Sequence, residues 1–166
     1  GLSRAELMQL GLKLGADVPF FVFGRNAFAE GVGEELVAVE TPSCWYVVLE
    51  PGVETPTAKI FSDPYLTRDT KAVRILDFSG APESFGKNDL QEVAIRLFPP
   101  IAEALEWLGR FGKARMTGSG SCVFCAFADE HEADAVLQAK DSANPAWKIW
   151  KARAIERHPL SQLMQS

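Results

Sequence analysis

The sequence is poor in cysteine and histidine and has no long apolar run. Three of its 166 residues are cysteine and two are histidine. Because three cysteines cannot all pair, a disulfide framework is not expected and the thiols should be reduced. No apolar run approaches the roughly 20 residues that span a bilayer, and no basic and then apolar leader opens the chain. These absences predict a cytoplasmic protein without a membrane partner.

Metal-ligating residues are scarce and badly spaced. Cys122 and Cys125 are three residues apart in an apolar segment typical of a strand, where such positions point to opposite faces. We therefore expect the pair to be structural. His131 and His158 each lack a second ligand at a useful spacing, so no protein metal site is expected.

Basic residues do not outnumber acidic ones. There are 17 lysines and arginines against 22 aspartates and glutamates, and the net charge is −5. A nucleic-acid partner is not expected, because binding a nucleic acid takes many cationic contacts to phosphate. The hydrophobic fraction of 47% and the length of 166 residues suffice for one good core, or for one domain and part of another.

Asp17 lies between an expected helix and an apolar run. Ser3 and Glu6 match a capping box at the start of a helix expected over 4–14. The run 20–23 lacks alternation, which predicts a strand covered on both faces. Asp17 is then either a turn residue that accepts nearby backbone N–H groups, which is the more frequent role for this pattern, or a partly desolvated carboxylate that acts as a base or electrostatic partner.

The remaining elements divide the chain into two parts. Short strands at 27–29 and 36–39 complete residues 1–40, which are too few for a domain and are expected to be the end of a larger one. Residues 41–166 are expected to form a ferredoxin-like β-α-β-β-α-β domain of the α+β class, with helices on one face of an antiparallel sheet. Strands are expected at 45–49, 113–117, 122–127 and 147–154, and helices at 55–61, 89–97, 99–108 and 130–139.

A glycine-rich turn, Gly118-Ser119-Gly120, joins two of the expected strands. Glycines let backbone N–H groups approach an anion closely. A hairpin turn needs no ligand to explain such a sequence, however, so the loop alone is a weak signal. It lacks the lysine of a phosphate-binding P-loop, the spacing of a dinucleotide fingerprint and the strand-to-helix setting of a nucleophile elbow.

Five segments, in order along the whole chain, carry a resemblance when they are taken together. They are Leu14–Phe21, Ala27–Glu34, Pro56–Phe61, Lys87–Leu90 and Met116–Ser121. With these segments the chain resembles the 4-diphosphocytidyl-2-C-methyl-D-erythritol kinases. That family belongs to the superfamily of galactokinase, homoserine kinase, mevalonate kinase and phosphomevalonate kinase.

The resemblance implies an activity and a role for several residues. It implies transfer of the γ-phosphoryl group of ATP, with Mg²⁺, to the 2-hydroxyl of cytidine-diphosphate-linked methylerythritol, a step of non-mevalonate isoprenoid synthesis. Asp17 matches the catalytic aspartate that accepts or orients the hydroxyl proton, and the loop 118–120 matches a motif beside the nucleotide phosphates. Phe61 matches an aromatic residue that stacks on cytosine, although the residue pattern alone also fits a core anchor. Val32 and Thr57 fall in segments that line the cytidine pocket.

Two motifs of the superfamily are missing from the chain. The first motif of the superfamily, with its catalytic lysine, and its Gly-rich, Ser-Ser-bearing phosphate loop are both absent. The chain therefore resembles the C-terminal portion of such a kinase, with the N-terminal portion as its expected partner, and it is expected to be inactive alone. Two alternatives remain: a ferredoxin-like ligand-binding or regulatory module, and a kinase for another small alcohol. The aromatic Phe61 favours a substrate with a nucleobase over a simple alcohol.

Overall fold

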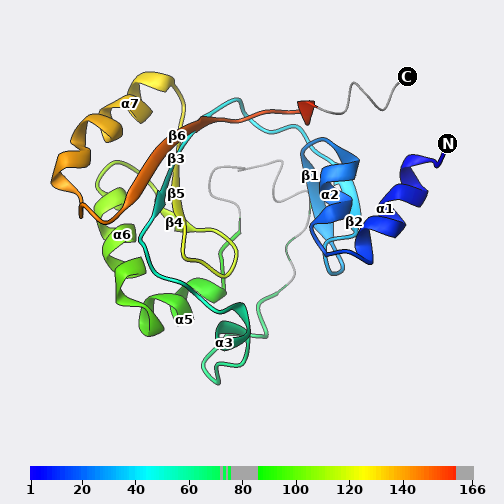
Figure 1. Ribbon diagram of the computed structural model, residues 1–166, viewed down its shortest axis with the longest axis horizontal. Helices are drawn as coiled ribbons and strands as arrows, with labels where there is room; N and C mark the ends of the chain where they lie inside the picture. The colour runs from blue at the N-terminus through cyan, green and yellow to red at the C-terminus, as the bar shows by residue number, and fades with distance from the viewer. Residues whose placement is uncertain (72, 74, 76–85, 160–166) are drawn as a thin grey trace. The chain divides into compact units, whose positions relative to one another are not determined.

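The computed structural model describes residues 1–71, 73, 75 and 86–159 (Figure 1). These residues belong to two compact units, Gly1–Pro42 with Ile155–Ser166 and Ser43–Ala154. The first boundary lies close to the division expected after residue 40. Residues from Ile155 on group with the first unit, whereas the sequence assigned them to the second part.

Backbone pairing explains why the chain returns to the first unit. Arg25 and Arg157 form an isolated antiparallel bridge. The N–H of Asn26 donates to the carbonyl oxygen of Glu156 at 3.2 Å, and the N–H of His158 donates to that of Gly24 at 2.9 Å. Such pairing joins main-chain N–H and C=O groups and does not depend on which side chains are present, so it could not be predicted from the sequence.

Helix α1, Arg4–Leu12, opens the first unit and has the expected capping box. The N–H of Glu6 donates to Ser3 Oγ at 3.3 Å, and the N–H of Ser3 donates to Glu6 Oε2 at 2.7 Å. The helix ends two residues before the expected end at Leu14. Its start is therefore confirmed, and its last turn is shorter than predicted.

The apolar run after Asp17 is a helix, so the predicted strand is wrong. Helix α2 spans Val18–Phe23, with Pro19 in its first turn. Gly24 closes it in a left-handed conformation, with φ 75°, and its N–H donates to the carbonyl oxygen of Phe20 at 3.0 Å. Proline at a helix start and glycine after its end are helix signals, and over six residues they outweigh an apolar run that fits either structure. The run is not covered on both faces either, because 59% of Phe21 is exposed.

A hairpin follows, as the sequence predicted. Strands β1, Ala27–Glu30, and β2, Glu35–Ala38, are antiparallel. Gly31 and Gly33, in the turn between them, have φ of 69° and 111°.

The second unit has the predicted order of elements and an antiparallel sheet. Its strand order is β4-β5-β3-β6, and α6 and α7 lie on one side of the sheet (Figure 1). The strands are β3, Trp45–Glu50; β4, Arg115–Met116; β5, Val123–Phe127; and β6, Lys148–Arg153. The helices are α3, Thr57–Phe61; α5, Leu90–Leu97; α6, Pro99–Gly109; α7, Glu130–Gln138; and the 3₁₀ helix η1, Ala139–Ser142.

The core of the second unit lies between the sheet and these helices. Val47 and Leu49 of β3 and Val123 of β5 are fully buried, and so is Ile101 of α6. Cys125 is in the same core, and burial raises the pKa of its thiol to about 11. A thiol with so high a pKa stays protonated, which fits a structural residue. Among the described residues, no helix is long and apolar enough to cross a membrane.

Candidate functional site

The glycine loop connects the short strand β4 to β5 and has a defined backbone. The N–H of Thr117 donates to the carbonyl oxygen of Cys122, and that of Gly120 donates to the carbonyl oxygen of Thr117, each at 3.0 Å. Gly118 and Gly120 have φ of 55° and 91°, which side chains disfavour. A Cβ on Gly120 would also lie 3.1 Å from the sulfur of Met116. Both glycines are therefore needed for this shape.

Asn88 ties the loop to the start of α5. Its Nδ2 donates to the carbonyl oxygens of Met116 at 3.0 Å and Gly118 at 2.8 Å. Its Oδ1 accepts from the N–H of Leu90 at 3.0 Å. Nearby, Gln91 Oε1 accepts from the N–H of Met116 at 2.8 Å. The sequence did not single out Asn88 or Gln91 for a site, although Asn88 lies in one of the segments that carry the resemblance.

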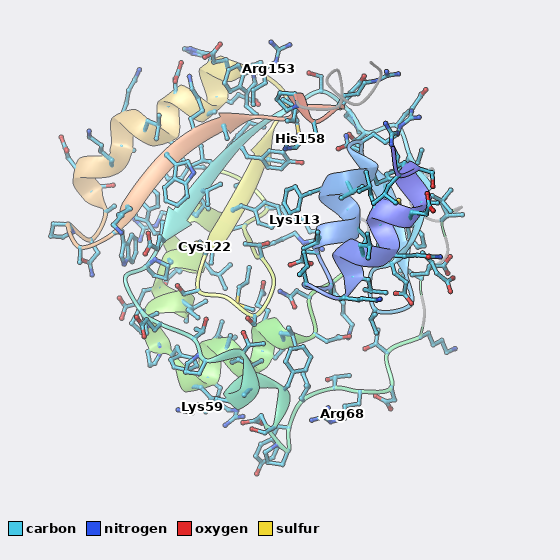
Figure 2. The ribbon with its side chains drawn as sticks, turned by 45° about the vertical axis from the view of Figure 1, so that its right-hand side comes forward. Lys59, Arg68, Lys113, Cys122, Arg153 and His158 are labelled. Atoms are coloured by element: carbon cyan, nitrogen blue, oxygen red, sulfur yellow. The ribbon has the colours of Figure 1, made fainter. Side chains whose placement is uncertain are left out.

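Helix α3 is joined to the same loop. The hydroxyl groups of Thr57 and Ser119 lie 2.9 Å apart and share a hydrogen bond. Phe61 lies four residues after Thr57, on the same face of α3. The ring of Phe61 is 51% exposed, whereas Ile60 is fully buried and anchors the helix. Phe61 is thus only half-buried, whereas Ile60 is the buried residue of this helix. Figure 2 labels Lys59, on this helix, and Cys122, where the loop enters β5.

The segment after α3 is fixed to α5 by a buried carboxylate. Asp63 is 8% exposed, accepts from the N–H of Tyr65 at 2.9 Å and pairs with Arg96 Nη2 at 2.6 Å. The Tyr65 N–H and then the Arg96 guanidinium hold the pKa of this carboxyl below its usual value, against the effect of burial. The carboxylate therefore stays charged and keeps the end of α3 in place.

Asp17 and Val32 lie in the first unit. Asp17 is exposed at the start of α2, and its side chain makes no capping hydrogen bond. Val32 is 72% exposed in the turn between β1 and β2, where its N–H donates to Glu34 Oε2 at 2.7 Å. A Cβ on Gly33 would lie 3.6 Å from the carbonyl oxygen of Ala16, so this turn is beside the residue that precedes Asp17. Asp17 stands at the N-cap position of α2, but its carboxylate accepts no backbone N–H there. The turn-residue role that the sequence pattern also allowed is therefore not what holds this carboxylate.

The predicted site residues thus form two groups. Thr57 and the loop 118–120 are in contact in the second unit, with Phe61 on the same helix as Thr57. Asp17 and Val32 are on neighbouring segments of the first unit. In the described ranges, no three histidine, cysteine, aspartate or glutamate side chains gather as a metal site.

Comparisons with known proteins give these groups a context. The model of the family "GHMP kinases C terminal" matches residues 67–145. The 4-diphosphocytidyl-2-C-methyl-D-erythritol kinase of Janthinobacterium sp. (strain Marseille) is 69% identical over the whole chain, which covers 56% of that protein. The kinase of the same name from Herminiimonas arsenicoxydans is 65% identical over 98% of the chain, which again covers 56% of the relative. The chain is thus similar to GHMP kinases, with the family model covering residues 67–145.

A solved structure agrees with this assignment. The crystal structure of a 4-(cytidine 5'-diphospho)-2C-methyl-D-erythritol kinase has a TM-score of 0.70 and 31% identity, covering 89% of this chain and 56% of that one. The chain thus spans about half the length of the relatives it matches, and it is similar to their C-terminal part. The predicted α+β fold and the family resemblance are both confirmed, and the regulatory-module alternative is disfavoured.

Proposed function

We propose that this chain is the C-terminal portion of an ATP-dependent kinase that phosphorylates the 2-hydroxyl of 4-diphosphocytidyl-2-C-methyl-D-erythritol. One contact carries the proposal, the hydrogen bond between Thr57 and Ser119. It joins the helix that carries the open Phe61 ring to the glycine loop, so a nucleobase-bearing substrate and a nucleotide phosphate chain would meet at one place. The names of the relatives point to the same substrate.

In this proposal the chain positions reactants and accepts a proton. The substrate hydroxyl oxygen attacks the γ-phosphorus of ATP, the bond to the bridging oxygen breaks and ADP leaves, while the hydroxyl proton passes to the Asp17 carboxylate. The face of Phe61 stacks on cytosine beside Thr57, and Val32, in the first unit, keeps the cytidine-binding role that the resemblance gives it. The loop Gly118-Ser119-Gly120 lies beside the phosphates. Mg²⁺, held mainly by the phosphates, supplies charge neutralisation when bound.

The remaining groups come from an N-terminal portion, as in the longer relatives. In this scheme residues 1–40 are the end of the N-terminal kinase domain and residues from 41 on form the C-terminal domain, with the chain from Ile155 returning to the first unit. We place the protein in the cytoplasm, where ATP and a charged nucleotide substrate are available. No part of this scheme needs a nucleic-acid or membrane partner.

A substrate panel tests the proposal. The chain would be extended at its N-terminus with the part of the Janthinobacterium relative that it does not cover; we call this protein the extended kinase. It would be given ATP, Mg²⁺ and, in separate reactions, the cytidylylated methylerythritol, homoserine, mevalonate or galactose. We expect a new phosphomonoester in the ³¹P spectrum with the cytidylylated substrate alone. Turnover of one of the other alcohols instead would favour the small-alcohol kinase.

A further inference from the structure

Asn88 makes three hydrogen bonds, one to the start of α5 and two to the segment that holds the glycine loop. Its Oδ1 accepts from the N–H of Leu90, two residues along, which is a local contact at the start of α5. Its Nδ2 donates to Met116 and Gly118, which are 28 and 30 residues away in the sequence. Because two partners are carbonyl oxygens and one is an N–H group, only one orientation of the side-chain amide satisfies all three.

The bond to Gly118 sets the direction of a peptide group. The C=O and N–H of one trans peptide point in opposite directions. With the carbonyl oxygen of Gly118 held toward Asn88, the N–H of Ser119, in the same peptide, points away from Asn88. Within the described part of the chain, this N–H has no hydrogen-bond partner. It is therefore a donor that the loop presents and does not use.

The neighbouring loop residues keep this peptide in place. The side chain of Ser119 bonds Thr57, and the N–H of Gly120 bonds Thr117, so the residues on both sides of the donor are fixed. Gly118 has φ 55°, a conformation that glycine adopts without strain. A preorganised N–H donor of this kind binds an anion without first having to be ordered.

We propose that Asn88 is a positioning residue that orients the Gly118–Ser119 peptide so that the Ser119 N–H donates to a phosphate oxygen of bound nucleotide. The inference rests on the proposed function and adds a residue to it. Asn88 itself does not touch the nucleotide. Its effect on ATP passes through the peptide group that it holds.

Asn88→Asp separates the contact at the start of α5 from those to the loop segment. An aspartate keeps the oxygen that accepts from Leu90, so the local contact at the start of α5 is kept. It loses both donors and turns a carboxylate oxygen toward two carbonyl oxygens, which releases the loop. Gln91→Glu is the matched control, because it makes the same change from amide to carboxylate one turn away and keeps the oxygen that accepts from Met116. A negative charge in the first turn of a helix is tolerated.

The variants would be compared in the extended kinase. For Asn88→Asp we expect the KM for ATP to rise by about 10-fold or more, the size of a lost hydrogen bond to a charged group, with the KM for the cytidylylated substrate and the melting temperature nearly unchanged. Gln91→Glu should leave all three near the wild-type values. An equal rise in both KM values with a fall in melting temperature, or no change at all, would overturn the inference.

A second measurement does not depend on turnover. In the ¹⁵N spectrum of the wild-type extended kinase, adding ADP with Mg²⁺ should shift the Ser119 amide, and Asn88→Asp should abolish that shift and speed hydrogen exchange at Gly120. A wild-type protein that shows the shift but phosphorylates none of the alcohols would refute the proposed function and leave the inference standing. A Ser119 amide that does not respond to nucleotide would refute the inference even in an active kinase.

Discussion

The two units of the molecule differ in how many apolar side chains they bury. In the described residues, every buried hydrophobic side chain of the core lies between residues 43 and 154. The first unit exposes many large apolar side chains: Leu2, Leu10, Leu12, Leu14, Phe20, Phe21, Val32, Val37 and Ile155. Exposed apolar surface is typical of an interaction site where it is contiguous. The second unit therefore has a core of its own, and we propose that the exposed side chains of the first unit pack against other protein.

The exposed residues of the first unit are not the ones that the sequence alone would select. Phe28 lies in β1 and is half-buried, and it makes contacts within the structure. Leu14, which the predicted helix would have placed on its buried face, follows the end of α1 and is 83% exposed. Together with Phe21 at 59%, it places exposed apolar side chains on both sides of Asp17. The proposed partner surface and the proposed catalytic residue therefore coincide.

The largest expected effect comes from the first unit and concerns chemistry. In the extended kinase, Asp17→Asn removes the proton acceptor and keeps the size of the side chain. We expect kcat to fall by roughly 10²–10⁴, the range of a general base, with the melting temperature unchanged because Asp17 is exposed and makes no cap. Steady-state kinetics with ATP and the cytidylylated substrate measure this. A kcat within a few-fold of wild type would remove Asp17 from the mechanism.

A pair of leucines tests the contrast in burial directly. Leu49 is fully buried in β3 and Leu14 is 83% exposed. Leu49→Ala should lower the free energy of unfolding by about 2–5 kcal/mol, the usual cost of a cavity in a core. Leu14→Ala, in the 166-residue chain, should change it by no more than about 0.5 kcal/mol, as expected for a surface position. Urea denaturation of the two variants gives both values, and equal losses would show that the units do not differ as described.

A second pair, on α3, sharpens the contrast within the second unit. Phe61→Ala should raise the KM for the cytidylylated substrate by the equivalent of about 1–3 kcal/mol, the worth of a base stacked on an aromatic ring, and should leave the KM for ATP and the melting temperature near wild type. Ile60→Ala should lower the melting temperature without a selective rise in the KM for the cytidylylated substrate, because Ile60 is fully buried and Phe61 is half-exposed. If Phe61→Ala lowered the melting temperature and changed both KM values alike, the ring would be a structural anchor.

The same contrast explains which features could be predicted from the sequence. The second unit was predicted well because local signals bound several of its elements, such as Pro56 before α3 and Pro99 at the start of α6. The run 20–23 was predicted as a strand because a short apolar run fits a strand and a helix equally well. The start of α1 was predicted because a capping box is a local signal.

Only some residues of the candidate site could be predicted from the sequence. Thr57, Phe61 and the loop 118–120 stand in segments with a recognisable composition. Asn88 does not reveal its role, because the oxygens that it bonds are 28 and 30 residues away and belong to the main chain. A main-chain acceptor has no side-chain signature, so contacts of this kind become visible only in three dimensions.

The most direct test of the account supplies the completing portion in trans. The 166-residue chain would be mixed with rising amounts of the separately made N-terminal portion of the Janthinobacterium relative, and ATP-dependent phosphorylation of the cytidylylated methylerythritol would be followed. We predict no turnover by the chain alone, and turnover that rises and saturates near one N-terminal portion per chain, since the phosphates must be cradled and their charge offset by groups that this chain lacks. Phosphorylation by the highly purified chain alone would contradict the account.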